Sequence, residues 1–176
     1  MTESTESVRR DSAARHLEQK EDVDWRGKDF KQSVFAYLYE NNDAGTEIDI
    51  VDLGTFYPWV SSTVGESSGV DYAVASAATD NITIGVSGEG VYIITAHSCF
   101  GGDNNSIIHG HIYKNGASTN IAFHRKLAGA DQGSASTSGL LRLASGDVLD
   151  LRYTSDTDNT TLILHHVGFT VVRISA

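Results

Sequence analysis

The sequence predicts an all-β sandwich of about ten strands, preceded by a short charged arm. From residue 30 onward, apolar residues recur at every second position in short runs, and Gly, Asn, Asp and Ser separate the runs. This part of the chain has almost no helical periodicity. Before residue 30, about half of the residues are charged and large apolar residues are few, so the segment cannot bury enough surface to fold by itself. The chain therefore divides into an N-terminal arm, residues 1–29, and a sandwich domain, residues 30–176.

The arm is predicted to contain one short helix. Ala13, Ala14 and Leu17 are good helix formers, and Asp11 or Ser12 can cap the first turn. The rest of the arm is polar and offers a few apolar side chains among many charges. We expect it to serve as an attachment device.

The strands of the sandwich domain are predicted from runs that alternate or are apolar throughout. NITIGV (81–86) alternates cleanly, and GVYIITAHSCF (90–100) is apolar almost throughout, as expected of a strand covered on both faces. The run NSIIHGHIYKNG (105–116) ends in Asn-Gly, which indicates a hairpin turn. In chain order, the predicted strands lie within 33–40, 47–60, 81–86, 90–100, 106–116, 120–127, 138–143, 147–153, 161–166 and 168–174.

Charge and composition exclude several classes of function. The formal net charge is -10, and residues 32–176 contain six basic and 15 acidic residues, so this domain repels phosphate backbones and is not expected to bind nucleic acid. No run approaches the ~20 apolar residues of a membrane span. The N-terminus lacks the apolar stretch of a secretory signal. Cys99 is the only cysteine, so an intrachain disulfide is impossible.

Four motifs follow one another in the order and spacing of a known fold. They are GEGVY at 88–92, Lys-Asn-Gly at 114–116, SGLLRLASGDVLDLRY at 138–153, and a phenylalanine, Phe169, near the start of the last strand. In these motifs, residues 30–176 resemble the jelly roll shared by tumour necrosis factor and the globular heads of complement and adiponectin-type proteins. The resemblance implies a jelly-roll sandwich that assembles as a compact homotrimer.

Within the third motif, Gly146 and Asp147 are interpreted as a turn. Gly146 can adopt a positive φ, and the carboxylate of Asp147 can accept backbone N–H bonds. We assign Asp147 this structural role and no catalytic one.

In the resembled fold, the strand 90–100 faces the sandwich core on one side and the threefold axis on the other. Alternation then places the set that begins with Tyr92 in the core, together with Phe169 and Val171 of the last strand. An obligate interface resembles a core cut in half, which explains why the second face is also apolar. The residues expected at the trimer interface are Val91, Ile93, Thr95, His97, Cys99, Thr170, Val172 and Ile174.

The histidines raise the question of a metal site. His109 and His111 have the His-x-His spacing that metal sites use, and trimeric phage spikes with such a motif hold iron on their axis. Because Ile108 and Ile112 take the inward face, we expect the two histidines to point outward. The resemblance implies that their strand belongs to the outer sheet, away from the axis, and we predict no metal site. His97 is expected to face the axis, where it can bond to a neighbouring subunit or meet its two copies.

Other candidate sites have simpler explanations. His165 and His166 are expected to point to opposite faces, and Cys99 to be a buried small hydrophobe. GGDNN (101–105) and SDTDNTT (155–161) are rich in oxygen ligands, with turn chemistry as the explanation and calcium as the alternative. No nucleophile elbow, phosphate loop or zinc motif is present. We predict no catalytic residue, no cofactor and no enzymatic activity.

Two functions fit this pattern. A short charged arm before such a domain, with no collagen-like stem or membrane anchor, is most similar to bacteriophage virion proteins with this fold. The first hypothesis is thus a head decoration or head-fibre protein, made in the host cytoplasm and located in the virion. Its arm would bind a capsid or other virion protein through Arg9, Arg10, Arg15, Leu17, Trp25 and Arg26.

The second hypothesis is a tail-tip or fibre module that recognises a host glycan or surface protein. Such recognition would use the apical loops of the sandwich. Tyr57, Trp59 and Tyr72 are the aromatic candidates in those loops.

Overall fold

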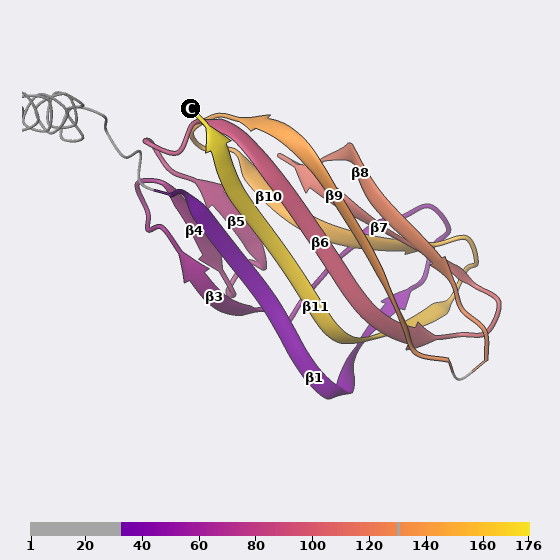
Figure 1. The fold of residues 1–176 in the computed structure, drawn as a ribbon. Helices are drawn as coiled ribbons and strands as arrows, with labels where there is room; N and C mark the ends of the chain where they lie inside the picture. Colours follow the sequence, from indigo (N-terminus) through magenta and orange to yellow (C-terminus); the bar gives the residue numbers. More distant parts are fainter. Residues whose placement is uncertain (1–32, 130) are drawn as a thin grey trace, which may run out of the picture. The chain divides into compact units, whose positions relative to one another are not determined.

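Two antiparallel sheets contain all the strands of the computed structural model, which describes residues 33–129 and 131–176 (Figure 1). The arm, its predicted helix and its expected attachment residues lie outside the described residues. In this described part, no helix could cross a membrane. The all-β sandwich is confirmed, with the strands β1 (Phe35–Ile50), β2 (Tyr57–Pro58), β3 (Thr63–Ser67), β4 (Ala73–Ser76), β5 (Asn81–Ile84), β6 (Gly90–Gly102), β7 (Ile107–Lys114), β8 (Ala117–Lys126), β9 (Gly133–Leu143), β10 (Val148–Ser155) and β11 (Thr160–Ser175).

The strands differ from the prediction in several ways. The predicted strand 47–60 is divided, because its first residues belong to β1 and only Tyr57–Pro58 forms a further strand, β2. The runs 161–166 and 168–174 form a single strand, β11, because Gly168 continues the pairing with both neighbours. The run 33–40 continues into β1 as far as Ile50, with a shift of register between Asn41 and Thr46. The short strands β3 and β4 were not predicted, since their sequences carry little apolar alternation.

The front sheet has the strand order β3-β1-β11-β6-β9, and the back sheet has the order β4-β5-β10-β7-β8. Figure 1 shows the two sheets stacked one behind the other. β6 and the first part of β1 alternate between a buried residue and a more exposed one, and β11 does so with interruptions. β9, at the edge of the sheet, alternates between half-buried and exposed residues. The front sheet therefore has one face in the core and one face outside it.

The core lies between the sheets and is filled by aromatic and branched aliphatic side chains. Its largest fully buried members are Trp59, Tyr92, Tyr153, Phe100, Phe169, Leu38, Ile50, Ile82, Ile84, Ile94, Ile108 and Ile112. Removing such side chains from water is the main favourable term in folding, at roughly 25 cal/mol per Å² of apolar surface.

One acidic side chain, Glu40, lies in this core at 6% exposure. Its Oε2 accepts a hydrogen bond from Trp59 Nε1 at 2.8 Å, and its Oε1 accepts one from the Thr46 hydroxyl. Nearby, the hydroxyls of Ser98 and Tyr153 are bonded at 2.6 Å. Burial and the Glu40 charge raise the pKa of Tyr153, although the Ser98 bond opposes this. Glu40, Ser98 and Tyr153 thus each have a hydrogen-bond partner, as burial of a polar group requires.

Two turns that carried the sequence resemblance are bonded to each other. Asn115 and Gly116 both have positive φ in the β7–β8 turn, and Gly146 has φ +84° in the β9–β10 turn. Asp147 accepts bonds from Ala144 N and Asn115 Nδ2, each at 2.7 Å, and its Oδ2 lies 2.7 Å from Lys114 Nζ. The predicted turn role of Asp147 is confirmed, and it extends to joining two hairpins.

The bonds that Asp147 makes between these two turns, called the clamp below, predict that the free energy of unfolding depends on pH. Burial opposes ionisation of Asp147, but the bonds from Lys114, Ala144 N–H and Asn115 outweigh it and hold its pKa below the ordinary 3.8. Because the folded-state pKa is lowered, this stabilisation is complete above the unfolded-state pKa and is lost as pH falls through the folded-state pKa. We expect Asp147→Asn to lower the free energy of unfolding by about 1–3 kcal/mol at pH 7. The loss should shrink on acidification below about pH 4.

Urea unfolding at several pH values measures this effect. Asp150→Asn is the matched control, because the Asp150–Arg152 pair lies within one strand and is partly exposed. Such a pair contributes about 0–1 kcal/mol. Equal losses in the two variants, or a pH-independent loss in Asp147→Asn, would contradict the clamp.

Candidate interface on the front sheet

The outer face of the front sheet is where the structure places all eight residues predicted for the trimer interface. On β6, the alternate set that includes Tyr92, Ile94 and Phe100 is fully buried in the core. Ile93 is 40% exposed on the other side, and its β11 partner Val172 is 39% exposed. The predicted facing of both strands is therefore correct, and the interface role itself stays a prediction.

Strand register arranges this face in four rows that each cross four strands. The first row, Phe35-Val172-Ile93-Leu140, is entirely apolar, and Leu140 is 61% exposed. The next rows become more polar along the strands. They are Tyr37-Thr170-Thr95-Ser138, then Tyr39-Gly168-His97-Ser136, then Asn41-His166-Cys99-Ser134.

Charge is absent from these rows. None of their sixteen positions holds Asp, Glu, Lys or Arg. The rest of the domain is strongly acidic, so the charges lie elsewhere on its surface. Arg142, the exposed β9 partner of Val91, lies beyond the apolar row. An uncharged stretch of surface on a charged domain is the composition expected of a surface that becomes covered.

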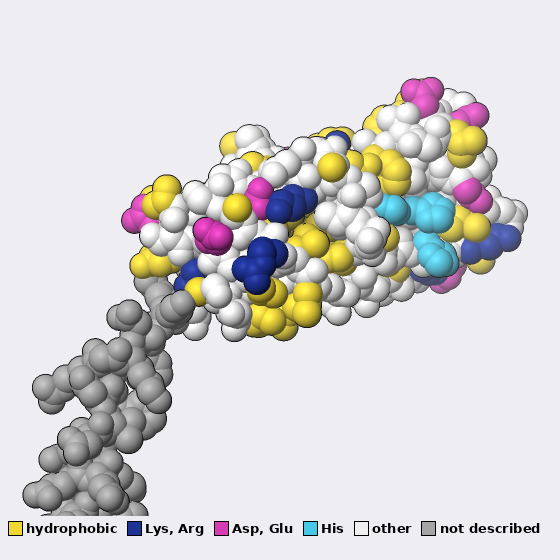
Figure 2. All heavy atoms as spheres, turned by 90° about the horizontal axis from the view of Figure 1, so that it is seen from above, with side chains coloured by type: hydrophobic (Ala, Val, Ile, Leu, Met, Phe, Trp, Pro, Cys, Tyr) yellow, Lys and Arg dark blue, Asp and Glu magenta, His cyan; other side chains and the backbone are white. Residues whose placement is uncertain are grey.

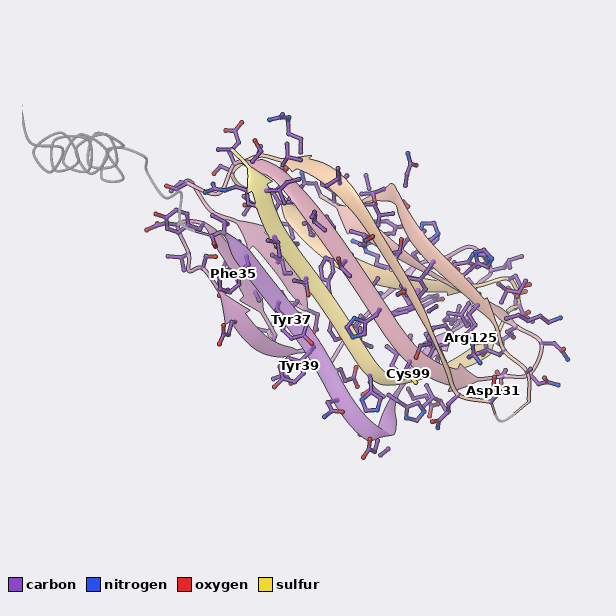
Figure 3. The ribbon with its side chains drawn as sticks, viewed as in Figure 1. Phe35, Tyr37, Tyr39, Cys99, Arg125 and Asp131 are labelled. Carbon is purple, nitrogen blue, oxygen red and sulfur yellow. The ribbon has the colours of Figure 1, made fainter. Side chains whose placement is uncertain are left out.

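Sequence analysis missed the aromatic side of this face, which β1 supplies. Figure 3 shows Phe35, Tyr37 and Tyr39 along β1, with Cys99 on β6 of the same sheet. The Tyr37 and Tyr39 rings stack with centroids 5.6 Å apart. The Tyr37 ring lies against Gly65 of β3, and a Cβ at Gly65 would overlap that ring. The pKa of Tyr37 is raised, first by burial and then by the neighbouring Tyr39. The alternation with Val34, Ala36 and Leu38 was the signal that could have identified these outward positions.

His97 and Cys99 lie in the more polar rows. The His97 ring rests on Gly168, where a Cβ would overlap it, so the glycine makes room for the imidazole on the sheet. Cys99 is a free cysteine and is half-buried, between His166 of β11 and Ser134 of β9 in the strand register. Complete burial of Cys99, as predicted, would require a second molecule to cover this face.

The expectation that His165 and His166 point to opposite faces is wrong. His165 Nδ1 lies 3.2 Å from the Asp43 carbonyl oxygen, and His166 Nε2 lies 3.6 Å from Asp43 Oδ1. The pairing with β6 is shifted between Leu164 and His166, which marks a β-bulge. A bulge adds one residue and interrupts the alternation, so both histidines contact the same residue of β1.

The oxygen-rich loops use their carboxylates to bind backbone. Asp103 Oδ2 accepts the Thr161 N–H at 2.8 Å, and Asp156 Oδ1 accepts the Ile107 N–H at 2.6 Å. Asp158 does the same for Leu53 N at 2.6 Å. Turn chemistry accounts for these residues, as expected.

The aromatic residues expected to bind a glycan have internal roles. Trp59 is fully buried and bonded to Glu40. The Tyr57 hydroxyl accepts the N–H groups of Val51 and Asp52 at 3.2 and 3.1 Å, and Tyr72 packs against the core. Trp59 therefore cannot contribute to a recognition surface, and the Tyr57 hydroxyl is engaged by its own loop.

His109 and His111 point outward, as predicted, with Ile108 and Ile112 fully buried on the opposite face. Gly110 between them faces the Phe123 ring, which a Cβ would overlap. Tyr113, which the alternation places on the same side as the histidines, is only 9% exposed. It is covered by Phe56 and by Arg152, whose Cζ lies 4.2 Å from the ring centroid.

Comparison with solved structures identifies the fold. The globular domain of zebrafish complement 1qA matches with a TM-score of 0.57 and 13% identity, covering 81% of this chain and 98% of that chain. Eiger TNF from S. frugiperda matches with a TM-score of 0.58 and 15% identity, covering 82% of this chain and 94% of that chain. Murine APRIL at pH 5.0 matches with a TM-score of 0.55 and 14% identity, covering 80% of this chain and 99% of that chain. No protein-family model and no curated protein matches the chain. The fold is the jelly roll of tumour necrosis factor and complement globular heads, as the motifs predicted.

The outward placement of the β7 histidines predicts a small effect of removing them. In chelator-treated buffer, the double substitution His109→Ala, His111→Ala should change the melting temperature only slightly, because substitutions on the outer face usually cost within about 0.5 kcal/mol. Differential scanning calorimetry measures this. A large fall would mean that these rings support the fold from within.

Proposed function

We propose that this chain is a non-enzymatic structural head that forms a homotrimer through the front sheet and is displayed on a virion by its N-terminal arm. The apolar row Phe35-Val172-Ile93-Leu140 carries this proposal. Exposed contiguous apolar surface of this kind usually marks a protein contact.

A second copy of the same chain is the occupant that best fits the face. The domain is acidic, so two copies repel each other wherever their charges approach. The sixteen uncharged positions offer a region where copies can meet without that repulsion. The face also has two unlike sides: β1 is aromatic, whereas β9 carries Leu140 in the first row and serines in the other three. Unlike sides in contact give a head-to-tail interface, which forms a ring when the rotation closes.

The trimer leads to a specific test. Ile93→Asp should convert the trimer to monomer, because it places a carboxylate from each chain in a dry interface, where desolvation and like charge both oppose assembly. Light scattering coupled to size exclusion measures the mass. Val86→Asp is the control, since Val86 is 76% exposed in the loop before β6 and off this face.

Circular dichroism should show that the Ile93→Asp chain remains folded. If the unmodified protein is a stable monomer at micromolar concentration, the face has another role and the trimer is excluded.

The virion role is supported by the contrast between the arm and the domain. Arginine guanidinium groups make paired hydrogen bonds to carboxylates, and the arm carries Arg9, Arg10, Arg15 and Arg26. Leu17 and Trp25 add apolar anchors, and Trp is frequent among residues that dominate binding energy. The acidic domain is poorly suited to adhere to a capsid of the same sign, so attachment falls to the arm.

Deletion of the arm tests this assignment. A chain that begins at Lys28 should still trimerise but should no longer decorate particles that lack the protein. Single arm substitutions should weaken attachment less than deletion does, because three arms on one trimer add avidity. Co-sedimentation with the particles measures the bound fraction. Undiminished decoration by the truncated chain would assign the attachment to the jelly roll.

A further inference from the structure

Histidine side chains gather on the back sheet, on the side of the domain away from the candidate interface. Figure 2 shows histidines side by side toward one end of the surface in view. His109 of β7 and His124 of β8 are direct partners in the strand register. Their ring centroids are 5.7 Å apart with an interplanar angle of 39°. His124 was not singled out from the sequence, since only the pairing of β7 with β8 brings it beside the His-x-His motif.

We propose that His109 and His124 together bind one divalent transition-metal ion of the kind that prefers imidazole, such as Zn²⁺ or Cu²⁺, and so link β7 to β8. Imidazole nitrogens lie about 2.0–2.1 Å from Zn²⁺. Two imidazoles on one tetrahedral ion therefore place their ring centres on the order of 5 Å apart. The observed centroid separation of 5.7 Å is close to this.

His111 lies on the same face but is held away from the pair. Its Nδ1 is 3.0 Å from the Ser118 hydroxyl, and its ring packs edge-on against Phe56 with centroids 4.7 Å apart. Among the residues the structure describes, no three His, Cys, Asp or Glu side chains are grouped to hold a metal ion. The site is thus a two-histidine chelate, and water fills the remaining positions on the ion.

The protonation state favours such binding at neutral pH. An imidazole must be neutral to bind a metal ion. Burial, and then the charge of His124, lowers the pKa of His109, while Asp156 opposes the shift. Burial and then His109 lower the pKa of His111 in the same way. The lowered pKa of His109 favours the neutral form of its ring, which is the form that binds a metal ion.

The test measures Zn²⁺ binding to the full-length, untagged chain by isothermal titration calorimetry and equilibrium dialysis. We expect one saturable Zn²⁺ ion per chain at this site. His109→Ala and His124→Ala should each weaken it at least tenfold. His111→Ala is the matched control on the same face, and His166→Ala is the control on the other sheet; both should bind as the unmodified chain does. Ca²⁺ should not compete, because it prefers oxygen ligands.

Melting temperature gives a second readout. Zn²⁺ should raise it in the unmodified chain and not in His124→Ala, because an ion that binds only the folded state stabilises that state. Binding that survives both His109→Ala and His124→Ala would place the ion elsewhere and overturn the proposal. An equal loss in His111→Ala would overturn the two-histidine assignment in favour of three ligands. This site does not rest on the proposed trimer, whose mass is measured separately.

Discussion

The register that pairs β1, β11, β6 and β9 decides both what the front sheet buries and what it presents. Side chains alternate along each strand where its register is regular, so aligning Phe35, Val172 and Ile93 outward also aligns Leu38, Phe169 and Ala96 inward. A slip of one residue in any strand would move its apolar set from the core to the surface and bring its outward side chains into the core. The core and the candidate interface are therefore two consequences of a single pairing.

The register is supported by polar contacts of two buried carboxylates, one between turns and one within the core. Asp147 joins the β9–β10 turn to Lys114 and Asn115 of the β7–β8 turn. Glu40 bonds Trp59 and Thr46 near the bulged middle of β1. Both carboxylates act between segments distant in sequence. They fix loops against the sandwich and leave the uncharged rows of the front sheet free of competing charges.

The two faces of the molecule differ in chemistry for a reason that follows from their position. The front sheet presents an apolar row and then progressively polar rows, which suits contact with another protein. The back sheet presents paired histidines beside half-buried aromatic rings, which suits a small ion rather than a large partner. Because the core separates the two faces, a change on one is not expected to alter the other through direct contact.

The sequence by itself determined the all-β class, the facing of β6 and β11, the Asn-Gly and Gly-Asp turns and the outward direction of His109 and His111. All of these follow from period-two alternation and local backbone preferences, which act over a few residues. The tertiary structure alone decided that His165 and His166 share Asp43, that Trp59 is buried and that His124 lies beside His109. These depend on a bulge, a loop fold and a strand pairing, each set by contacts between segments far apart in the chain. The candidate interface stands between the two cases. Alternation identified its β6 and β11 residues, but only strand order brought Phe35, Tyr37, Tyr39 and Leu140 into the same rows.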